Sequence, residues 1–180
     1  MAKYRRYRKY SRRSHPKWAS NIQEIGTTSV VSQGPGANYY SMVLAFNPLQ
    51  TNTAVSQIYT VKNMEVTFYT DLISNQLPNA TEIEDITAYI MFVPQGMNVT
   101  TTYNLEHPEY IMAYKFIGQP CQDTSTSLAQ PAKVRTRLSR RLNTGDSIIM
   151  FLKYNDTRTS TSNTPSFYFH GIARWNTKAN

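Results

Sequence analysis

Cysteine, glycine and charged residues are all scarce in this chain of 180 residues, which has one cysteine, seven glycines and 17% charged residues. The lone Cys121 cannot form an intrachain disulfide, and no Cys/His set at metal-ligand spacing accompanies it. Apolar runs such as Ile148–Leu152 are far shorter than the ~20 residues of a membrane helix. No apolar stretch of the kind found in a secretory signal follows the basic N-terminus. We therefore expect no metal, no cofactor, no membrane insertion and no cleaved secretion signal.

Residue patterns that catalysis requires are also missing. His15, His107 and His170 are the only histidines, and they are far apart in the sequence. No Gly-x-Ser-x-Gly turn or reactive-cysteine context supplies a nucleophile with a positioned base. No glycine loop of the phosphate-cradling kind occurs either. The sequence therefore predicts a protein that is not an enzyme.

The formal charge of +8 is concentrated in residues 1–17, which contain no acidic residue. The remaining 163 residues carry 19 − 8 = 11 basic residues against all 11 acidic ones, so this body is neutral. A block of like charges repels itself and buries nothing, so we expect a disordered arm until a polyanion neutralises it. The eight cations of the arm are Lys3, Arg5, Arg6, Arg8, Lys9, Arg12, Arg13 and Lys17.

The composition of the arm favours nucleic-acid binding. Lysine and arginine neutralise phosphates and release counterions, which gives affinity with little sequence preference. Tyr4, Tyr7 and Tyr10 recur between the cations, and tyrosine can stack on the unpaired bases of a single strand. Two alternatives are a nuclear localisation signal and a solubilising tail, and the tyrosines could simply space the charges.

The body has the pattern of an all-β fold. Prolines recur mostly every 11 to 17 residues, helix signals are scarce, and several segments alternate apolar and polar residues. Eight strands are predicted, at Ile22–Ser32, Tyr39–Phe46, Val61–Thr70, Ile86–Val93, Tyr110–Ile117, Lys133–Leu138, Ser147–Tyr154 and Phe167–Trp175. Ser147–Tyr154 is apolar on both faces and should be a covered central strand.

The lengths of the connections refine this fold class. Long polar loops are expected at Asn47–Ser56, Ser74–Glu82, Gly118–Ala132 and Asn155–Pro165, and they should supply most of the exposed exterior. Eight antiparallel strands with long crossings predict an eight-stranded antiparallel jelly-roll sandwich. We divide the chain into an arm at residues 1–19 and a jelly-roll domain at residues 20–180.

A second group of cations lies within the body. Lys133, Arg135 and Arg137 alternate with less polar residues, so in a strand they project from one face, and Arg140 and Arg141 follow. This cluster could line an interior beside nucleic acid, meet acidic neighbours across a subunit contact, or form a solvated polar face. The acidic groupings are Glu82, Glu84, Asp85, Glu106 and Glu109. Their spacing does not follow a calcium loop, and surface solubility or pairing with the basic cluster is the favoured interpretation.

Four segments resemble the capsid proteins of small circular Rep-encoding single-stranded DNA viruses, the circovirus-like group. The arm YRRYRKYSRR resembles their arginine-rich start, and YTVKNMEVTFYT resembles their fourth strand. SIIMFLKYN resembles the strand before their last long loop, and FYFHGIARWN their closing strand. The chain is shorter than typical members, and its basic arm is about half as long.

The resemblance implies a jelly roll of two four-stranded sheets, and sixty copies in a T=1 icosahedral shell with the arms inside. It implies the chain itself and a single-stranded DNA genome as partners, with host nuclear import machinery and a cell-surface attachment factor as further ones. The chain would then be found in the virion, and in the host nucleus during assembly. The alternatives are a satellite-type RNA virus capsid, a monomeric nucleic-acid-binding module, and a β-sandwich enzyme or lectin.

Overall fold

The computed structural model describes residues 18–48, 58–72, 82–120, 131–158 and 164–179. These residues form nine strands and two short helices, and every strand pairing is antiparallel. The strands are β1 (Ala19–Val31), β2 (Gly36–Phe46), β3 (Tyr59–Leu72), β4 (Ile83–Val93), β5 (Ile111–Gly118), β6 (Ala132–Thr136), β7 (Arg140–Leu142), β8 (Ser147–Asp156) and β9 (Ser166–Ala179). The helices are α1 (Tyr103–Glu106) and the 3₁₀ turn η2 (Pro108–Tyr110).

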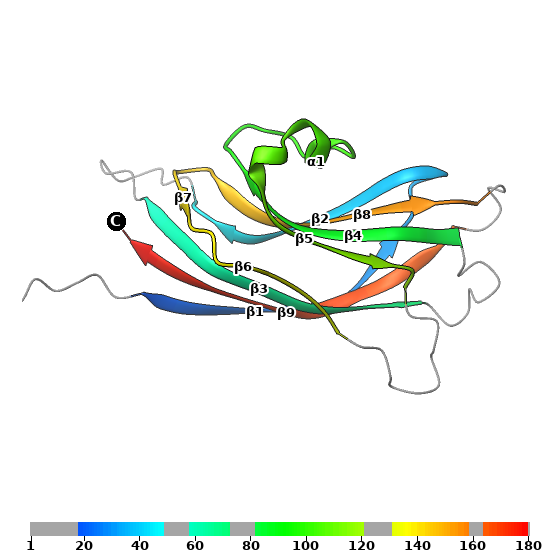
Figure 1. The fold of residues 1–180 in the computed structure, drawn as a ribbon, viewed down its shortest axis with the longest axis horizontal. Helices are drawn as coiled ribbons and strands as arrows, with labels where there is room; N and C mark the ends of the chain where they lie inside the picture. The colour runs from blue at the N-terminus through cyan, green and yellow to red at the C-terminus, as the bar shows by residue number, and fades with distance from the viewer. Residues whose placement is uncertain (1–17, 49–57, 73–81, 121–130, 159–163, 180) are drawn as a thin grey trace, which may run out of the picture.

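The strands form two sheets that pack face to face (Figure 1). One sheet has the order β1-β9-β3-β6, with β7 also paired to β3, and the other has the order β2-β8-β4-β5. Most connections cross from one sheet to the other, as from β1 to β2, β2 to β3 and β8 to β9. A five-stranded and a four-stranded antiparallel sheet linked in this way form a jelly-roll sandwich with one additional short strand, so the predicted fold class is confirmed.

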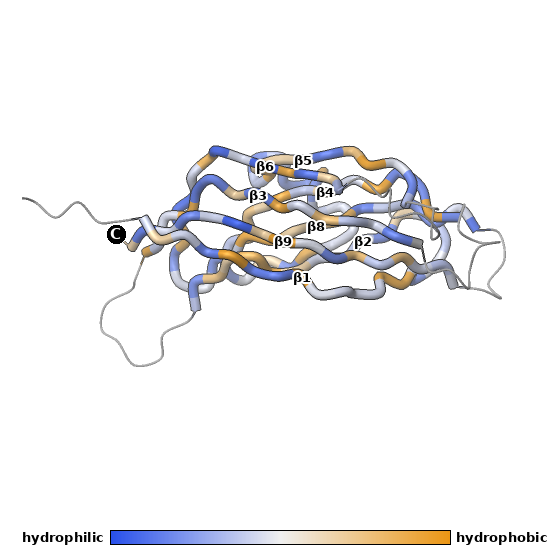
Figure 2. The backbone as a smooth tube through the Cα atoms, turned by 90° about the horizontal axis from the view of Figure 1, so that it is seen from below, coloured by the Kyte–Doolittle hydropathy of each residue, from blue (hydrophilic) through white to orange (hydrophobic). Residues whose placement is uncertain are grey.

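The core lies between the sheets and follows the period-two alternation of the sequence. On β3 the side chains of Met64, Val66 and Phe68 are buried, while Glu65 and Thr67 between them point outward. Figure 2, which views the molecule from the side of the β1-β9-β3-β6 sheet, shows hydrophilic and hydrophobic segments alternating along the strands. This sheet therefore has one apolar face on the core and one polar face outward.

The prediction that β8 is covered on both faces is confirmed. Its inner residues Ile148, Met150 and Leu152 belong to the main core. Its outer residues Ile149 and Phe151 are buried in a second cluster, beneath the segment of residues 94–110 that carries α1 and η2. Figure 1 shows this segment above the β2-β8-β4-β5 sheet.

All eight predicted strands are present, and several are longer than predicted: β9 ends at Ala179 and not at Trp175, and β8 continues to Asp156, into the predicted loop at Asn155–Pro165. Three further differences concern whole elements. The short strand β7 was not predicted, because three residues are too few for a periodic pattern. The predicted strand Lys133–Leu138 ends at Thr136, and the segment 94–110 was not predicted as a cover. Most of the four predicted long loops fall on residues 49–57, 73–81, 121–130 and 159–163, which lie outside the described residues.

Candidate nucleic-acid interface

Cations from four strands gather on the outward face of the β1-β9-β3-β6 sheet. The strand register places Arg135 beside Glu65, and Glu65 beside Arg174, in one row across β6, β3 and β9. The next rows toward the end of β9 place Lys62 beside Asn176, and Thr60 between Arg141 and Lys178. We name this set the cationic half-face: Lys62, Lys133, Arg135, Arg137, Arg141, Arg174 and Lys178.

Acidic groups neutralise this half-face only in part. Glu65 lies among the cations, and its Oε1 is 3.1 Å from the Nζ of Lys133. Glu24 of β1 lies in the same row as Lys133, and Asp71 lies further along the same outward face, where its Oδ2 is 3.7 Å from His170 Nδ1. Seven of the 11 body cations are therefore on this half-face with two acids, Glu65 and Glu24, although the body as a whole is neutral.

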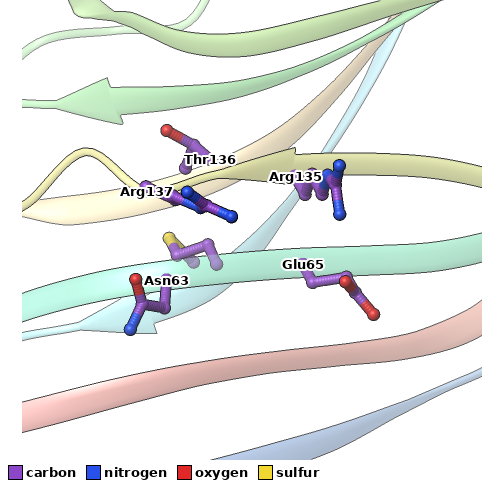
Figure 3. Close-up of a pocket in the computed structure, with 6 residues that line it drawn as sticks. Asn63, Glu65, Arg135, Thr136 and Arg137 are labelled. Atoms are coloured by element: carbon purple, nitrogen blue, oxygen red, sulfur yellow. The ribbon is translucent and has the colours of Figure 1, made fainter.

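A recess of about 540 Å³ opens in the cationic half-face where β3 meets β6 (Figure 3). It is lined by Asn63, Met64, Glu65, Arg135, Thr136 and Arg137. The side chains of Arg135 and Arg137 extend from the β6 side toward β3, which carries Asn63 and Glu65.

The recess exists because the sheet edge is interrupted. The last pair between β6 and β3 is Thr136 with Met64, and the first pair between β7 and β3 is Arg140 with Val61. Residues 62 and 63 of β3 therefore pair with neither strand. At the same level β3 has a bulge against β9, and Asn63 adopts a φ of 53°, which asparagine tolerates better than most residues.

The root of the N-terminal arm lies over the same half-face. β1 starts at Ala19, opposite Thr177 of β9, so β9 separates it from β3. Even so, the ring of Trp18 contacts β3, because the Nζ of Lys62 lies 3.8 Å from the ring centroid. The side chains of Trp18 and Lys62 therefore meet across β9. Residues 1–17, with the eight arm cations, lie outside the described residues.

The predicted body cluster divides into two parts. Lys133 and Arg135 project outward from β6 as predicted, and Arg137 follows the end of the strand but still lines the recess. Arg141 also faces outward, opposite Thr60. Arg140 does not join them, because its guanidinium lies 5.0 Å from the Phe92 ring centroid and donates a hydrogen bond of 2.7 Å to the Glu109 carbonyl.

Lys62, Arg174 and Lys178 were not predicted as part of the cluster. Arg174 lies within a predicted strand, where alternation alone could have put it on the outward face. Strict alternation would put Lys62 on the inner face with Met64 and Val66, and only the bulge at Asn63 turns it outward. Whether these residues lie near Arg135 depends on the order of β6, β3 and β9 in the sheet, which the alternation of residues along each strand cannot reveal. Of the acidic groupings, Glu109 meets the basic cluster only through its backbone carbonyl.

The outward face of the other sheet has a different chemistry. The segment 94–110 covers its centre, and large apolar side chains remain exposed around it, namely Val43, Leu105, Tyr114 and Phe116. Tyr114 and Phe116 lie on the edge strand β5 and are 69% and 59% exposed. One outer face of the sandwich therefore carries most of the body cations, while both faces expose large apolar side chains, such as Ile22 and Ile172 on the cationic one.

Within the described residues, no three His, Cys, Asp or Glu side chains come close enough together to hold a metal ion. No described helix is long and apolar enough to cross a membrane.

The strand order and the cationic half-face define a jelly-roll protein with one strongly basic surface. No family model matches the chain, and no curated protein matches it at a significant level. The structure is similar to one of infectious bursal disease virus, Gx strain, with a TM-score of 0.37, 9% identity and 91% of this chain covered. The chain spans about a third of that virus protein, 32%.

Two other solved structures show a similar degree of likeness. One is of Desmodium yellow mottle tymovirus, with a TM-score of 0.36, 18% identity, 90% of this chain covered and 88% of that one. The other is of Israeli acute paralysis virus, with a TM-score of 0.31, 9% identity, and 89% and 74% covered. At these scores the likeness establishes no family, and the function proposed below rests on the chain's own residues.

Proposed function

We propose that this chain is a viral capsid subunit, without catalytic activity, that assembles into a small icosahedral shell and packages single-stranded DNA. The jelly roll is an architecture used by viral capsid domains, among others. The observation that carries the proposal is the distribution of charge: seven body cations lie on the outward face of one sheet, beside the root of the basic arm, and large apolar side chains such as Tyr114 and Phe116 are exposed on the other. A subunit between an enclosed polyanion and its neighbours needs both kinds of surface.

In this proposal the β1-β9-β3-β6 sheet faces the interior. Trp18, at the root of the arm, contacts Lys62 of the cationic half-face, so the arm and this half-face would contact the same nucleic acid. Their charges would neutralise phosphates together, with affinity that falls as salt rises. The resemblance of the arm and three strands to circovirus-like capsid proteins supports sixty copies in a T=1 shell, single-stranded DNA as cargo, and nuclear import during assembly.

A monomeric nucleic-acid-binding module is the second candidate, and the structure gives it specific support. Such a module needs a basic face on its folded domain, which the neutral body charge argued against and the cationic half-face supplies. A capsid subunit that encloses RNA fits the same surfaces, because charge-driven binding does not distinguish the two nucleic acids well.

Electron microscopy of the purified chain separates these candidates. Negative-stain images of the purified full chain, with and without added single-stranded DNA, should show closed particles of uniform size. A chain that stays monomeric over the whole concentration range would contradict the capsid proposal and favour the binding module. Nuclease digestion of the nucleic acid extracted from particles would then identify DNA or RNA as the cargo.

A further inference from the structure

We propose that the recess between Arg135 and Arg137 binds a backbone phosphate of single-stranded nucleic acid, so that each subunit fixes one point of the strand. This inference rests on the proposed function and deepens it, because it gives the folded body a defined contact in addition to the arm. The ligand class is a phosphodiester, and the contacting groups belong to β3 and to the end of β6.

The two arginines have their charge available for a ligand. Among the described residues, no carboxylate forms an ion pair with Arg135 or Arg137. Glu65, the nearest acid in the strand register, is 3.1 Å from Lys133 instead. The two guanidinium groups share the recess with one carboxylate, Glu65, which is paired with Lys133, so a net positive charge remains there that a bound phosphate would neutralise.

The donor geometry suits a phosphate. A guanidinium presents a planar fork of N–H donors that matches phosphate oxygens in a bidentate manner. The amide of Asn63 adds a donor from the opposite side of the recess, where φ of 53° turns this residue out of the regular strand. The recess opens to solvent where residues 62 and 63 have no partner strand on the β6 side, so an extended polymer could pass through it.

The surroundings favour nucleic acid over an isolated anion. Lys62 is next to Asn63 in the chain and contacts Trp18, so the recess adjoins the root of the arm. Arg174 lies on the far side of Glu65 in the same row. A nucleic-acid strand that is held by the arm would therefore reach the recess over a continuous cationic surface. The Trp18 ring, which is 39% exposed, lies between the arm and the recess, where a base could stack on it.

The test compares full-length variants for their binding of a twenty-nucleotide oligo-dT over a salt series, measured by fluorescence anisotropy. Arg135→Gln/Arg137→Gln should bind roughly tenfold more weakly at a fixed moderate salt concentration. The slope of log K against log salt should shrink by about 0.7, since each single-strand phosphate contact contributes about 0.7 and the recess binds one phosphate. Lys115→Gln/Lys153→Gln is the matched control, because it removes two charges from the other sheet and should leave the slope unchanged.

The outcomes separate the inference from the proposed function. If the wild type forms no particles and binds no oligo-dT, the proposed function fails. If the wild type does both and the arginine variant matches the wild type or the control, the recess inference alone is overturned. A loss of the same size for a heparin oligosaccharide, without a loss for oligo-dT, would also overturn it. Unchanged thermal unfolding of the variant would show that the exposed arginines do not act through folding.

Discussion

At the scale of single residues, Gly171 is the described glycine that leaves the least room for a side chain. A Cβ atom there would lie 2.2 Å from the Thr67 carbonyl oxygen and 2.7 Å from the Phe68 Cα, which are backbone atoms that cannot move aside. Gly171→Ala should therefore force β9 away from β3 and lower the free energy of unfolding by about 2 kcal/mol or more. Urea unfolding measures this loss.

Gly26 provides the control for that substitution. It also lies in a strand of the same sheet, but a Cβ there would meet nothing within 4 Å. Gly26→Ala should leave stability within about 0.5 kcal/mol of the wild type. Equal losses at the two glycines would contradict the steric explanation.

Two buried tyrosines make the body sensitive to alkali. Burial, with a smaller contribution from Asp156, raises the pKa of Tyr154 from 10.0 to about 12. Burial, followed by Tyr110 and Glu109, likewise raises the pKa of Tyr103 to about 12. Between pH 10 and pH 12 the unfolded chain loses protons that the folded chain retains, so stability falls as pH rises through this window.

Tyr154→Phe tests this linkage. It removes one titrating hydroxyl together with its 3.3 Å hydrogen bond to the Val31 carbonyl. The variant should be somewhat less stable at pH 8, yet lose less stability than the wild type between pH 9 and pH 11. Urea midpoints at the three pH values measure the difference. Equal losses of stability with rising pH in the two proteins would show that Tyr154 does not cause the sensitivity to alkali.

At the scale of the secondary-structure elements, the segment 94–110 stabilises the sheet that it covers. Tyr103 of α1 is buried against Met91, Ile149 and Phe151, and its hydroxyl donates a 3.1 Å hydrogen bond to the Phe92 carbonyl. Tyr103→Ala should lower the free energy of unfolding by about 3–5 kcal/mol, as other large-to-small core changes do. Leu105→Ala on the same helix should change it little, because Leu105 is 66% exposed.

The elements also show how far the sequence could predict the structure. Strands such as β3 and β8 were predictable because period-two alternation, or its absence in a doubly covered strand, is a local signal. The bulge at Asn63, the end of β6 at Thr136 and the strand β7 depend on pairing between distant segments. These three features together form the recess. The sequence was therefore sufficient to name Arg135 and Arg137, but not to predict the shape of the recess or the position of the third donor, Asn63.

At the scale of the whole molecule, the net charge of the body does not reveal where its charged residues lie on the surface. The body has 11 cations and 11 acids, and if these were spread evenly its surface would be neutral everywhere. Folding instead brings seven cations to one half of one sheet, because alternate residues of β3, β6 and β9 point outward together. The arm and the folded body should therefore contribute separately to binding.

That separation can be measured with two full-length variants. Replacing the eight arm cations by glutamine should remove most nucleic-acid retention, because each neutralised phosphate contributes to the salt dependence. Retention that remains should disappear when Arg135 and Arg174 are also replaced by glutamine. Absorbance ratios of purified particles at 260 and 280 nm give the readout. Full retention after arm neutralisation would contradict the electrostatic account of packaging.

The two faces also predict how assembly responds to salt. In a shell, the arms and cationic half-faces of neighbouring subunits would converge and repel one another unless a polyanion or salt screens them. The contacts between subunits would use apolar and aromatic surface, for which Leu105, Tyr114 and Phe116 are exposed candidates. Raising salt without nucleic acid weakens the repulsion while leaving apolar burial intact, so it should favour assembly. Light scattering across a salt series at constant pH measures this. Particles that dissociate as salt rises would instead show that ion pairs between subunits hold the shell together, and the exposed apolar residues would then need a different explanation.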